Sequence, residues 1–179
     1  MGMQARGQPR IRPAGIALLA AIALGTTELY AESPPKDPAA VLELGGAAAW
    51  GVPAGGFSGG PTVAAEVTPI EDWLELEGGL TGLFAKGSTE WDTDLVFKKP
   101  WTLSRRAEFM AGIGPEWVPT RQGGVTSNAI AGEGVLDFMF WPAKRHKFGW
   151  YFEPSYDYSF GQGHEQSAGV TGGLLIAIP

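Results

Sequence analysis

The stretch Asp72–Phe84, with the sequence DWLELEGGLTGLF, decides how the rest of the chain is interpreted. In an extended strand its leucines fall on one face, while Glu75 and Glu77 share the opposite face. A helix would place the two glutamates about 200° apart and scatter the leucines. The stretch therefore predicts a strand. In a soluble barrel the leucine face would line the core, whereas in a membrane barrel it would face lipid and the acids would face the lumen.

Seven other segments have the same two-residue alternation. The chain has 179 residues, enough for one domain, and it has no cysteine, so no disulfide framework is available. The eight predicted strands are Ala40–Trp50, Pro61–Thr68, Asp72–Phe84, Trp91–Lys98, Arg106–Val118, Asn128–Phe140, Phe148–Phe160 and Gln166–Ile178. Their number and their length of about ten residues are typical of an antiparallel membrane barrel.

The N-terminus predicts export. Three arginines precede the apolar run Ile16–Leu24, and a short polar region ends at Ala31, which is the layout of a secretory signal. We expect residues 1–31 to be the signal peptide, 32–39 a proline-rich periplasmic lead-in and 40–179 the barrel. Without 1–31 the chain carries 10 basic and 18 acidic residues, a net charge of −8. This charge argues against nucleic-acid binding, which requires clustered Lys and Arg.

Three patterns favour lipid as the solvent of the apolar face. Every tryptophan lies near a predicted segment end or turn, as in the aromatic girdle of a membrane barrel. The acids fall on the face opposite the large apolar residues. Tight turns at 69–72, 99–105 and 141–147 alternate with glycine-rich loops at 51–60, 119–127 and 161–165, although the short loop 86–90 fits less well. The predicted girdle consists of Trp50, Trp73, Trp91, Trp101, Trp117, Trp141 and Trp150. The main alternative is a secreted soluble barrel of the lipocalin type, with its apolar side chains inside.

In pattern and length, residues 40–179 resemble small eight-stranded outer-membrane β-barrels such as the OmpA transmembrane domain and OmpX. The last strand, GVTGGLLIAIP, has the alternating apolar residues of the family's assembly signal, but it ends in Pro179 where the family usually has an aromatic residue. The resemblance implies an eight-stranded antiparallel up-and-down transmembrane β-barrel in the outer membrane of a Gram-negative bacterium. It also implies a monomer without cofactor, surrounded by lipid and lipopolysaccharide and inserted by the barrel-assembly machinery. Pro115 and Pro154 are expected at bulges or beyond the membrane, because proline removes a ladder donor.

The predicted lumen is rich in acids. Carboxylates crowded in a narrow lumen repel one another and take up protons unless bases, water or a cation relieve them. Eight strands leave just enough width for side chains to fill the interior, so we expect a plugged lumen held by an acid–base network. Its predicted members are Glu43, Glu66, Glu75, Glu77, Lys98, Arg106, Glu108, Glu133, Asp137 and Glu153.

The sequence predicts a structural or surface-interaction role, and two groups of residues suggest alternatives to it. Glu90, Asp92 and Asp94 have hard oxygens on one face, which could hold Ca²⁺, but their spacing matches no calcium loop, so no metal site is predicted. His164 and Ser167 could serve a lipid A-modifying enzyme, but residues three apart in a strand point to opposite faces, so no catalytic residue is predicted. A narrow cation path through the lumen is the remaining alternative.

Overall fold

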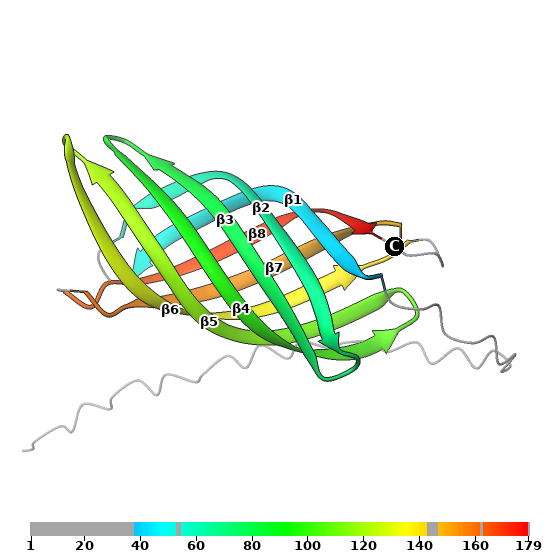
Figure 1. Cartoon of the computed structure of the whole chain (residues 1–179). Helices are drawn as coiled ribbons and strands as arrows, with labels where there is room; N and C mark the ends of the chain where they lie inside the picture. The colour runs from blue at the N-terminus through cyan, green and yellow to red at the C-terminus, as the bar shows by residue number, and fades with distance from the viewer. Residues whose placement is uncertain (1–37, 53–54, 143–146, 162, 179) are drawn as a thin grey trace, which may run out of the picture. The chain divides into compact units, whose positions relative to one another are not determined.

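The computed structural model describes residues 38–52, 55–142, 147–161 and 163–178. All eight predicted strands are present, and they form one closed barrel in which each strand pairs with its sequence neighbours and β8 pairs with β1 (Figure 1). The strands are β1 (Ala40–Val52), β2 (Phe57–Ile70), β3 (Leu74–Ala85), β4 (Ser88–Ser104), β5 (Ala107–Gln122), β6 (Val125–Phe140), β7 (Phe148–Ser159) and β8 (Gln166–Ile178). The predicted signal peptide lies outside the described residues and stays a prediction.

All eight pairings are antiparallel, which confirms the predicted fold class. The closing pair of β1 and β8 runs from Ala40 opposite Ile178 to Val52 opposite Gln166. We call the end that holds Ala40 and Ile178 the terminal rim; its connections are 71–73, 105–106 and 141–147. The opposite end, with connections 53–56, 86–87, 123–124 and 160–165, is the distal rim. Within the described residues, no helix is long and apolar enough to cross a membrane.

Three of the four connections at the distal rim are shorter than predicted. Most of the predicted loop 119–127 belongs to strands, because β5 reaches Gln122 and β6 begins at Val125. The turn between them is Gly123–Gly124, with φ of 57° and 85°. Two successive residues of positive φ make the tight hairpin turn that suits twisted strands. The predicted contrast between short turns at one rim and looser loops at the other is therefore wrong.

Strand β4 also continues through a predicted turn, 99–105, and ends at Ser104. Its pairing with β3 stops at Lys98, whereas its pairing with β5 continues through Pro100 opposite Met110. Because β3 does not pair with β4 beyond Lys98, the backbone of β4 has no hydrogen bond to donate on that side. Pro100, which lacks an N–H, is therefore tolerated there. Pro115 in β5 and Pro154 in β7 have no register shift beside them, which corrects the expected bulges.

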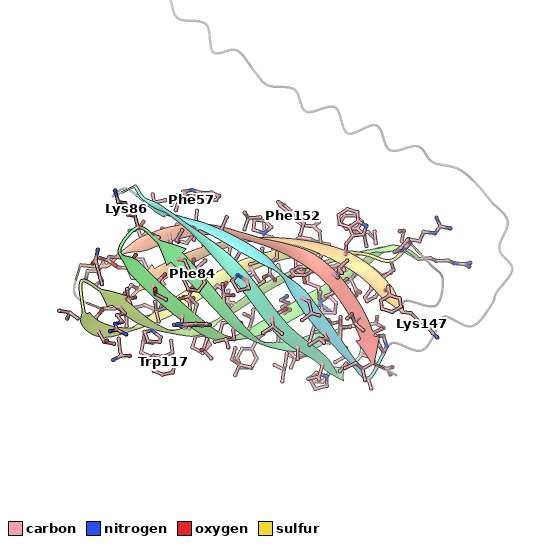
Figure 2. The ribbon with its side chains drawn as sticks, turned by 90° about the horizontal axis from the view of Figure 1, so that it is seen from above. Phe57, Phe84, Lys86, Trp117, Lys147 and Phe152 are labelled. Carbon is pink, nitrogen blue, oxygen red and sulfur yellow. The ribbon has the colours of Figure 1, made fainter. Side chains whose placement is uncertain are left out.

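The barrel wall is apolar outside and charged inside. Large apolar side chains of every strand are exposed on the outer face, among them Leu80, Ile113 and Leu174. Figure 2 shows Trp117 and Phe152 directed away from the barrel, with Lys86 and Lys147 near its opposite ends. The buried polar residues are Glu43, Glu66, Glu75, Glu77, Asp92, Lys98, Glu116, Asp137 and Glu153. The polarity predicted from Asp72–Phe84 is thus the polarity of the whole barrel.

Candidate functional site: the charged lumen

The lumen is organised around Lys98, whose side chain is fully buried. Its ammonium donates hydrogen bonds to Glu77, to Asp137 at 2.9 Å and to Glu153 at 2.7 Å. Glu66 lies 3.7 Å away as a further ion-pair partner. These four carboxylates come from β2, β3, β6 and β7, so one ammonium joins strands on different sides of the barrel.

Lys98 reaches across the lumen because its neighbour on β5 is a glycine. Gly112 lies opposite Lys98 in the β4–β5 register. A Cβ at Gly112 would lie 2.8 Å from Lys98 Cγ and 2.7 Å from Val96 Cγ1, closer than side-chain carbons approach one another. The glycine therefore leaves the space through which the lysine side chain extends toward β6 and β7.

Most predicted members of the acid–base network line this lumen. Glu43 and Glu75 are buried beside the lysine partners, Glu133 lines a small cavity next to them, and Glu108 is half-buried on the inner face of β5. Arg106 is different: it is exposed in the turn between β4 and β5. Its predicted place in the network is corrected, because the chain turns before the alternation of β5 begins.

A second group of acids lines the distal half of the lumen. Asp92 and Glu116 are each 8% exposed, and Glu90 accepts a hydrogen bond from Thr120 at 2.9 Å. Asp157 accepts one from Ser167 at 3.0 Å. Among the described residues of the inner wall, Lys98 is the one Lys or Arg, and the donors to Glu90 and Asp157 are the hydroxyls of Thr120 and Ser167. The lumen thus carries a high density of acidic groups from the distal rim to Lys98.

An apolar plug closes the lumen toward the terminal rim. Six buried side chains from five strands and one turn pack together there: Val41, Met110, Met139, Trp141, Tyr151 and Leu175. Between this plug and the distal acids lies a cavity of about 30 Å³, lined by residues that include Glu43, Glu77, Tyr151 and Glu153. A volume of that size holds one or two waters or an ion rather than a continuous column of solvent. The plug gives the narrow-channel alternative no support.

Six of the seven predicted girdle tryptophans are exposed on the outer wall. Trp73, Trp101 and Trp150 lie toward the terminal rim, and Trp50, Trp91 and Trp117 toward the distal rim. Trp141 is 3% exposed and belongs to the plug, so its predicted place in the girdle is wrong. Phe140 is the last residue of β6 and faces outward, and Trp141 continues the alternation inward, in phase with Asp137 and Met139.

Aromatic residues of adjacent strands also contact each other on the outer wall near the terminal rim. Ring centroids are 5.5 Å apart for Trp101–Phe109, 5.0 Å for Phe109–Phe138 and 4.0 Å for Phe140–Trp150. Such pairs stabilise neighbouring strands on one face of a sheet. These residues therefore form a nearly continuous aromatic belt from β4 to β7 near the terminal rim.

The residues of the enzyme alternative point apart. Ser167 bonds to Asp157 on the inner wall, whereas His164 stacks on Tyr158 of the outer face, with 5.8 Å between ring centroids. A serine needs a base within hydrogen-bond reach to act as a nucleophile. His164 and Ser167 do not form such a pair, so the geometry gives no support to catalysis by them.

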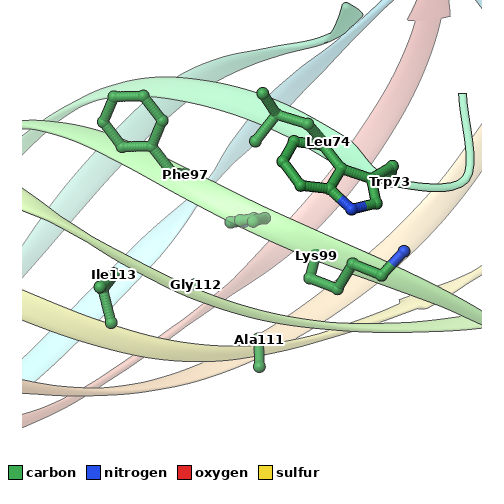
Figure 3. A pocket seen from close by; sticks show the side chains of 8 residues that line it. Trp73, Leu74, Phe97, Lys99, Ala111, Gly112 and Ile113 are labelled. Atoms are coloured by element: carbon green, nitrogen blue, oxygen red, sulfur yellow. The ribbon is translucent and has the colours of Figure 1, made fainter. Parts of the chain in front are cut away.

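A shallow hollow lies on the outer wall across β3, β4 and β5. Figure 3 shows Trp73 and Lys99 at one end of it and Phe97 and Ile113 at the other. The small side chain of Ala111 also lines it. The Lys99 ammonium donates a hydrogen bond to the backbone carbonyl of Asp72, which holds it beside the tryptophan.

The plug is the part of the lumen that sequence reasoning missed. Met110, Met139, Tyr151 and Leu175 have the same strand parity as the inward acids, and this parity was the available signal. Their apolar and aromatic side chains place them outside the acid–base network that the sequence predicts.

Comparison with protein-family models gave no match, and comparison with curated proteins gave none either. Among solved structures, the barrel is similar to Neisserial surface protein A (NspA), with a TM-score of 0.65, 12% identity, and coverage of 78% of this chain and 97% of that chain. It is also similar to Ail, the attachment invasion locus protein of Yersinia pestis, with a TM-score of 0.53, 10% identity, and coverage of 78% and 99%. The chain therefore has the fold of the small eight-stranded outer-membrane β-barrels.

Proposed function

We propose that this protein is an integral outer-membrane barrel of a Gram-negative bacterium with a closed lumen, which acts at the cell surface through its distal rim. The observation that carries the proposal is the polarity of the wall. Large apolar side chains are exposed around all eight strands, while charged side chains are buried inside. A barrel in water has the reverse arrangement, as the lipocalin alternative required, because exposed apolar area in water is unfavourable.

The aromatic rings support the same environment. Tryptophan has an apolar body and one N–H donor, so it favours the level of the lipid headgroups. Three exposed tryptophans lie toward each rim, with aliphatic residues such as Leu80 and Leu95 between the two levels. This spacing fits a bilayer that surrounds the middle of the barrel.

A structural or surface-interaction role follows from the plugged lumen. Val41, Met110, Met139, Trp141 and Leu175 pack together across the terminal end of the described barrel, which argues against transport through it. What remains accessible is the distal rim, where Arg121, Gln122, Val125 and Thr126 are exposed beside the Gly123–Gly124 turn. We place partner contacts there, because exposed hairpin ends project beyond the wall.

Lipid is the partner that the outer wall itself would contact. The hollow between Phe97 and Ile113 is apolar, with Trp73 and Lys99 at its terminal end. An acyl chain would pack against the apolar part of the hollow, and an anionic headgroup would pair with the Lys99 ammonium. Lysine side chains near a membrane interface commonly extend toward the charged headgroups. We further propose that the protein is a monomer, in contact with lipopolysaccharide in the outer leaflet and inserted by the barrel-assembly machinery.

The absence of cysteine from the chain allows a direct test of membrane topology. Lys86 in the β3–β4 turn and Lys147 before β7 are both exposed, and Figure 2 shows them near opposite ends of the barrel. In intact cells, a membrane-impermeant maleimide should label Lys86→Cys and leave Lys147→Cys unlabelled until the outer membrane is permeabilised. Cell fractionation should place both variants in the outer-membrane fraction.

Two results would overturn the proposal. Recovery of the protein in the soluble fraction excludes membrane integration. Equal labelling of both cysteines in intact cells excludes the assignment of the distal rim to the cell surface. Migration on detergent gels, with and without heating, provides the control for folding, because a folded barrel and its unfolded chain migrate differently.

A further inference from the structure

One group of carboxylates in the lumen has more acceptors than the protein can satisfy. Glu43, Glu66, Glu77 and Asp137 each contribute a carboxylate oxygen, and these four oxygens lie within 4.8 Å of one another. All four residues are buried, with exposed fractions between 0% and 4%. They come from β1, β2, β3 and β6, so the group bridges both sides of the lumen.

Lys98 cannot complete this group. A lysine ammonium has three N–H donors, and those of Lys98 are used by Glu77, Asp137 and Glu153. Glu43 Oε1, Glu66 Oε2 and Asp137 Oδ1 are buried without any hydrogen-bond partner. A buried acceptor without a partner is costly, more so when it is charged. Glu43 and Asp137 therefore each have one buried oxygen without a partner, and Glu66 Oε2 has only its 3.7 Å ion pair with Lys98.

The charge balance points in the same direction. Five carboxylates surround Lys98 when Glu153 is counted with the other four, which leaves a formal charge of −4 around one ammonium. The distal acids increase the negative potential along the path from the distal rim. A second positive charge in this place would satisfy the unpaired oxygens and reduce the repulsion among the carboxylates.

We propose that Glu43, Glu66, Glu77 and Asp137 form a binding site for a hard metal cation of the size of Ca²⁺, beside the Lys98 ammonium. Carboxylate oxygens are the preferred ligands of Ca²⁺, at about 2.3–2.6 Å, so ligands on opposite sides of the ion lie roughly 4.6–5.2 Å apart. The four oxygens lie within 4.8 Å of one another, which is within the span of the ligands around one such ion. The adjoining cavity of about 30 Å³ has room for a water ligand, which Ca²⁺ often retains.

The charges of the lumen indicate the side from which a cation would approach. The cavity is lined by Glu43 and Glu77 on the side of the site and by Asp94 and Glu133 toward the distal rim. The apolar plug closes the other end. A cation would enter from the distal rim, pass the distal acids and stop at the site, where it would link β1 to β6 across the lumen.

Equilibrium dialysis tests the proposal. The full chain, purified from membranes in a non-ionic detergent and stripped with EDTA, is dialysed against CaCl₂ in NaCl, and bound calcium is measured by elemental analysis. We expect one Ca²⁺ per barrel. Loss of a partner that supports a metal ligand typically costs roughly 10–100-fold in affinity, so Glu43→Gln or Asp137→Asn should weaken binding at least about tenfold.

A matched control uses a lumen acid outside the site. Asp157→Asn removes one charge from the distal group, and Asp157 is not among the four converging residues. It should keep one bound Ca²⁺ with less than about a threefold change in affinity, as expected for a charge that acts at a distance. MgCl₂ replaces CaCl₂ in a parallel series, because Mg²⁺ requires shorter distances and a more regular geometry.

Each outcome decides the question. No calcium bound to the wild-type barrel at millimolar CaCl₂ overturns the proposal, because the carboxylates are then neutralised by protons. Equal loss of binding in Asp157→Asn and Glu43→Gln also overturns it, because the ions are then a diffuse atmosphere. If either site variant fails to fold by its gel mobility, the other variant and the wild-type stoichiometry still decide. Exchange of Mg²⁺ for Ca²⁺ with equal affinity would overturn the assignment of ion size.

Discussion

Replacement of Lys98 by methionine tests whether the ammonium holds the barrel together. Methionine has a similar length and volume, so Lys98→Met removes the charge and its three hydrogen bonds with little change in packing. Removal of one partner from a buried ion pair typically costs about 3–5 kcal/mol, because the remaining charges are left uncompensated. Here at least three carboxylates lose their donor, so we expect a loss of at least 3 kcal/mol, roughly a third of the stability of a typical domain.

The assay is reversible urea unfolding of the barrel in lipid vesicles, followed by tryptophan fluorescence, at neutral pH and in EDTA. The neighbouring lysine provides a matched control, because Lys99 lies on the outer face and its ammonium bonds to the backbone carbonyl of Asp72. Lys99→Met should change the unfolding free energy by less than about 1 kcal/mol, as solvent-accessible charges usually do.

A double variant separates electrostatics from packing. When Glu77→Gln is added to Lys98→Met, one uncompensated charge is removed, so the double variant should be more stable than Lys98→Met alone. An unfolding free energy of Lys98→Met within about 1 kcal/mol of the wild type would refute the reasoning. It would mean that protons already neutralise the carboxylates and that Lys98 contributes little.

Three further predictions follow from other parts of the barrel. A Cβ at Gly45 would clash with the backbone carbonyl oxygen of Gly172 and lie 2.7 Å from the Tyr151 hydroxyl, whereas the nearest atom to a Cβ at Gly46 is 3.6 Å away. Gly45→Ala should therefore lower the unfolding free energy by about 1–3 kcal/mol and Gly46→Ala by much less in urea titrations. In vesicles, Leu80→Arg should lower the unfolding free energy by about 2–4 kcal/mol, and Val125→Arg at the distal rim should lower it by at most about 1 kcal/mol. Equal losses in the two variants would contradict a bilayer around the middle of the barrel. Trp141→Ala removes the largest side chain of the plug, so it should lower the unfolding free energy by about 3–5 kcal/mol. It should also conduct ions in planar bilayers, where we expect no current from the wild type. A variant of wild-type stability that conducts no ions would show that the plug lies elsewhere.

The alternation of side chains could be read from the sequence because it is local. In a strand the face of each residue depends only on its parity, so the leucines and glutamates of Asp72–Phe84 determine which face is charged. The same rule predicts the inward direction of Glu43, Asp137 and Glu153, and the structure confirms it by their burial. Where the rule was not applied, as at Trp141, the prediction was wrong.

Strand ends and connections were less accessible to sequence reasoning. Glycine and polar residues near the distal rim predicted loops, but Thr126 and Ser127 pair with Arg121 and Thr120 in a continuous ladder. Such residues occur in loops and in exposed strands alike, so composition alone does not distinguish the two. The pairing partner decides, and that partner is a property of the barrel.

The sequence by itself therefore determined the number of strands, their antiparallel order and the sign of each face, because these depend on residues close together in the chain. The tertiary structure alone decided which inward residues meet. Glu43, Glu66, Glu77 and Asp137 come together because their strands are staggered around a closed barrel, in which Glu66 pairs directly with Glu77. The position of a residue along the barrel axis depends on the registers of all the strand pairs together, so it cannot be derived from any single segment. In Asp72–Phe84, the parity placed Glu75 and Glu77 inside, and only closure of the barrel gave Glu77 the Lys98 ammonium as its partner.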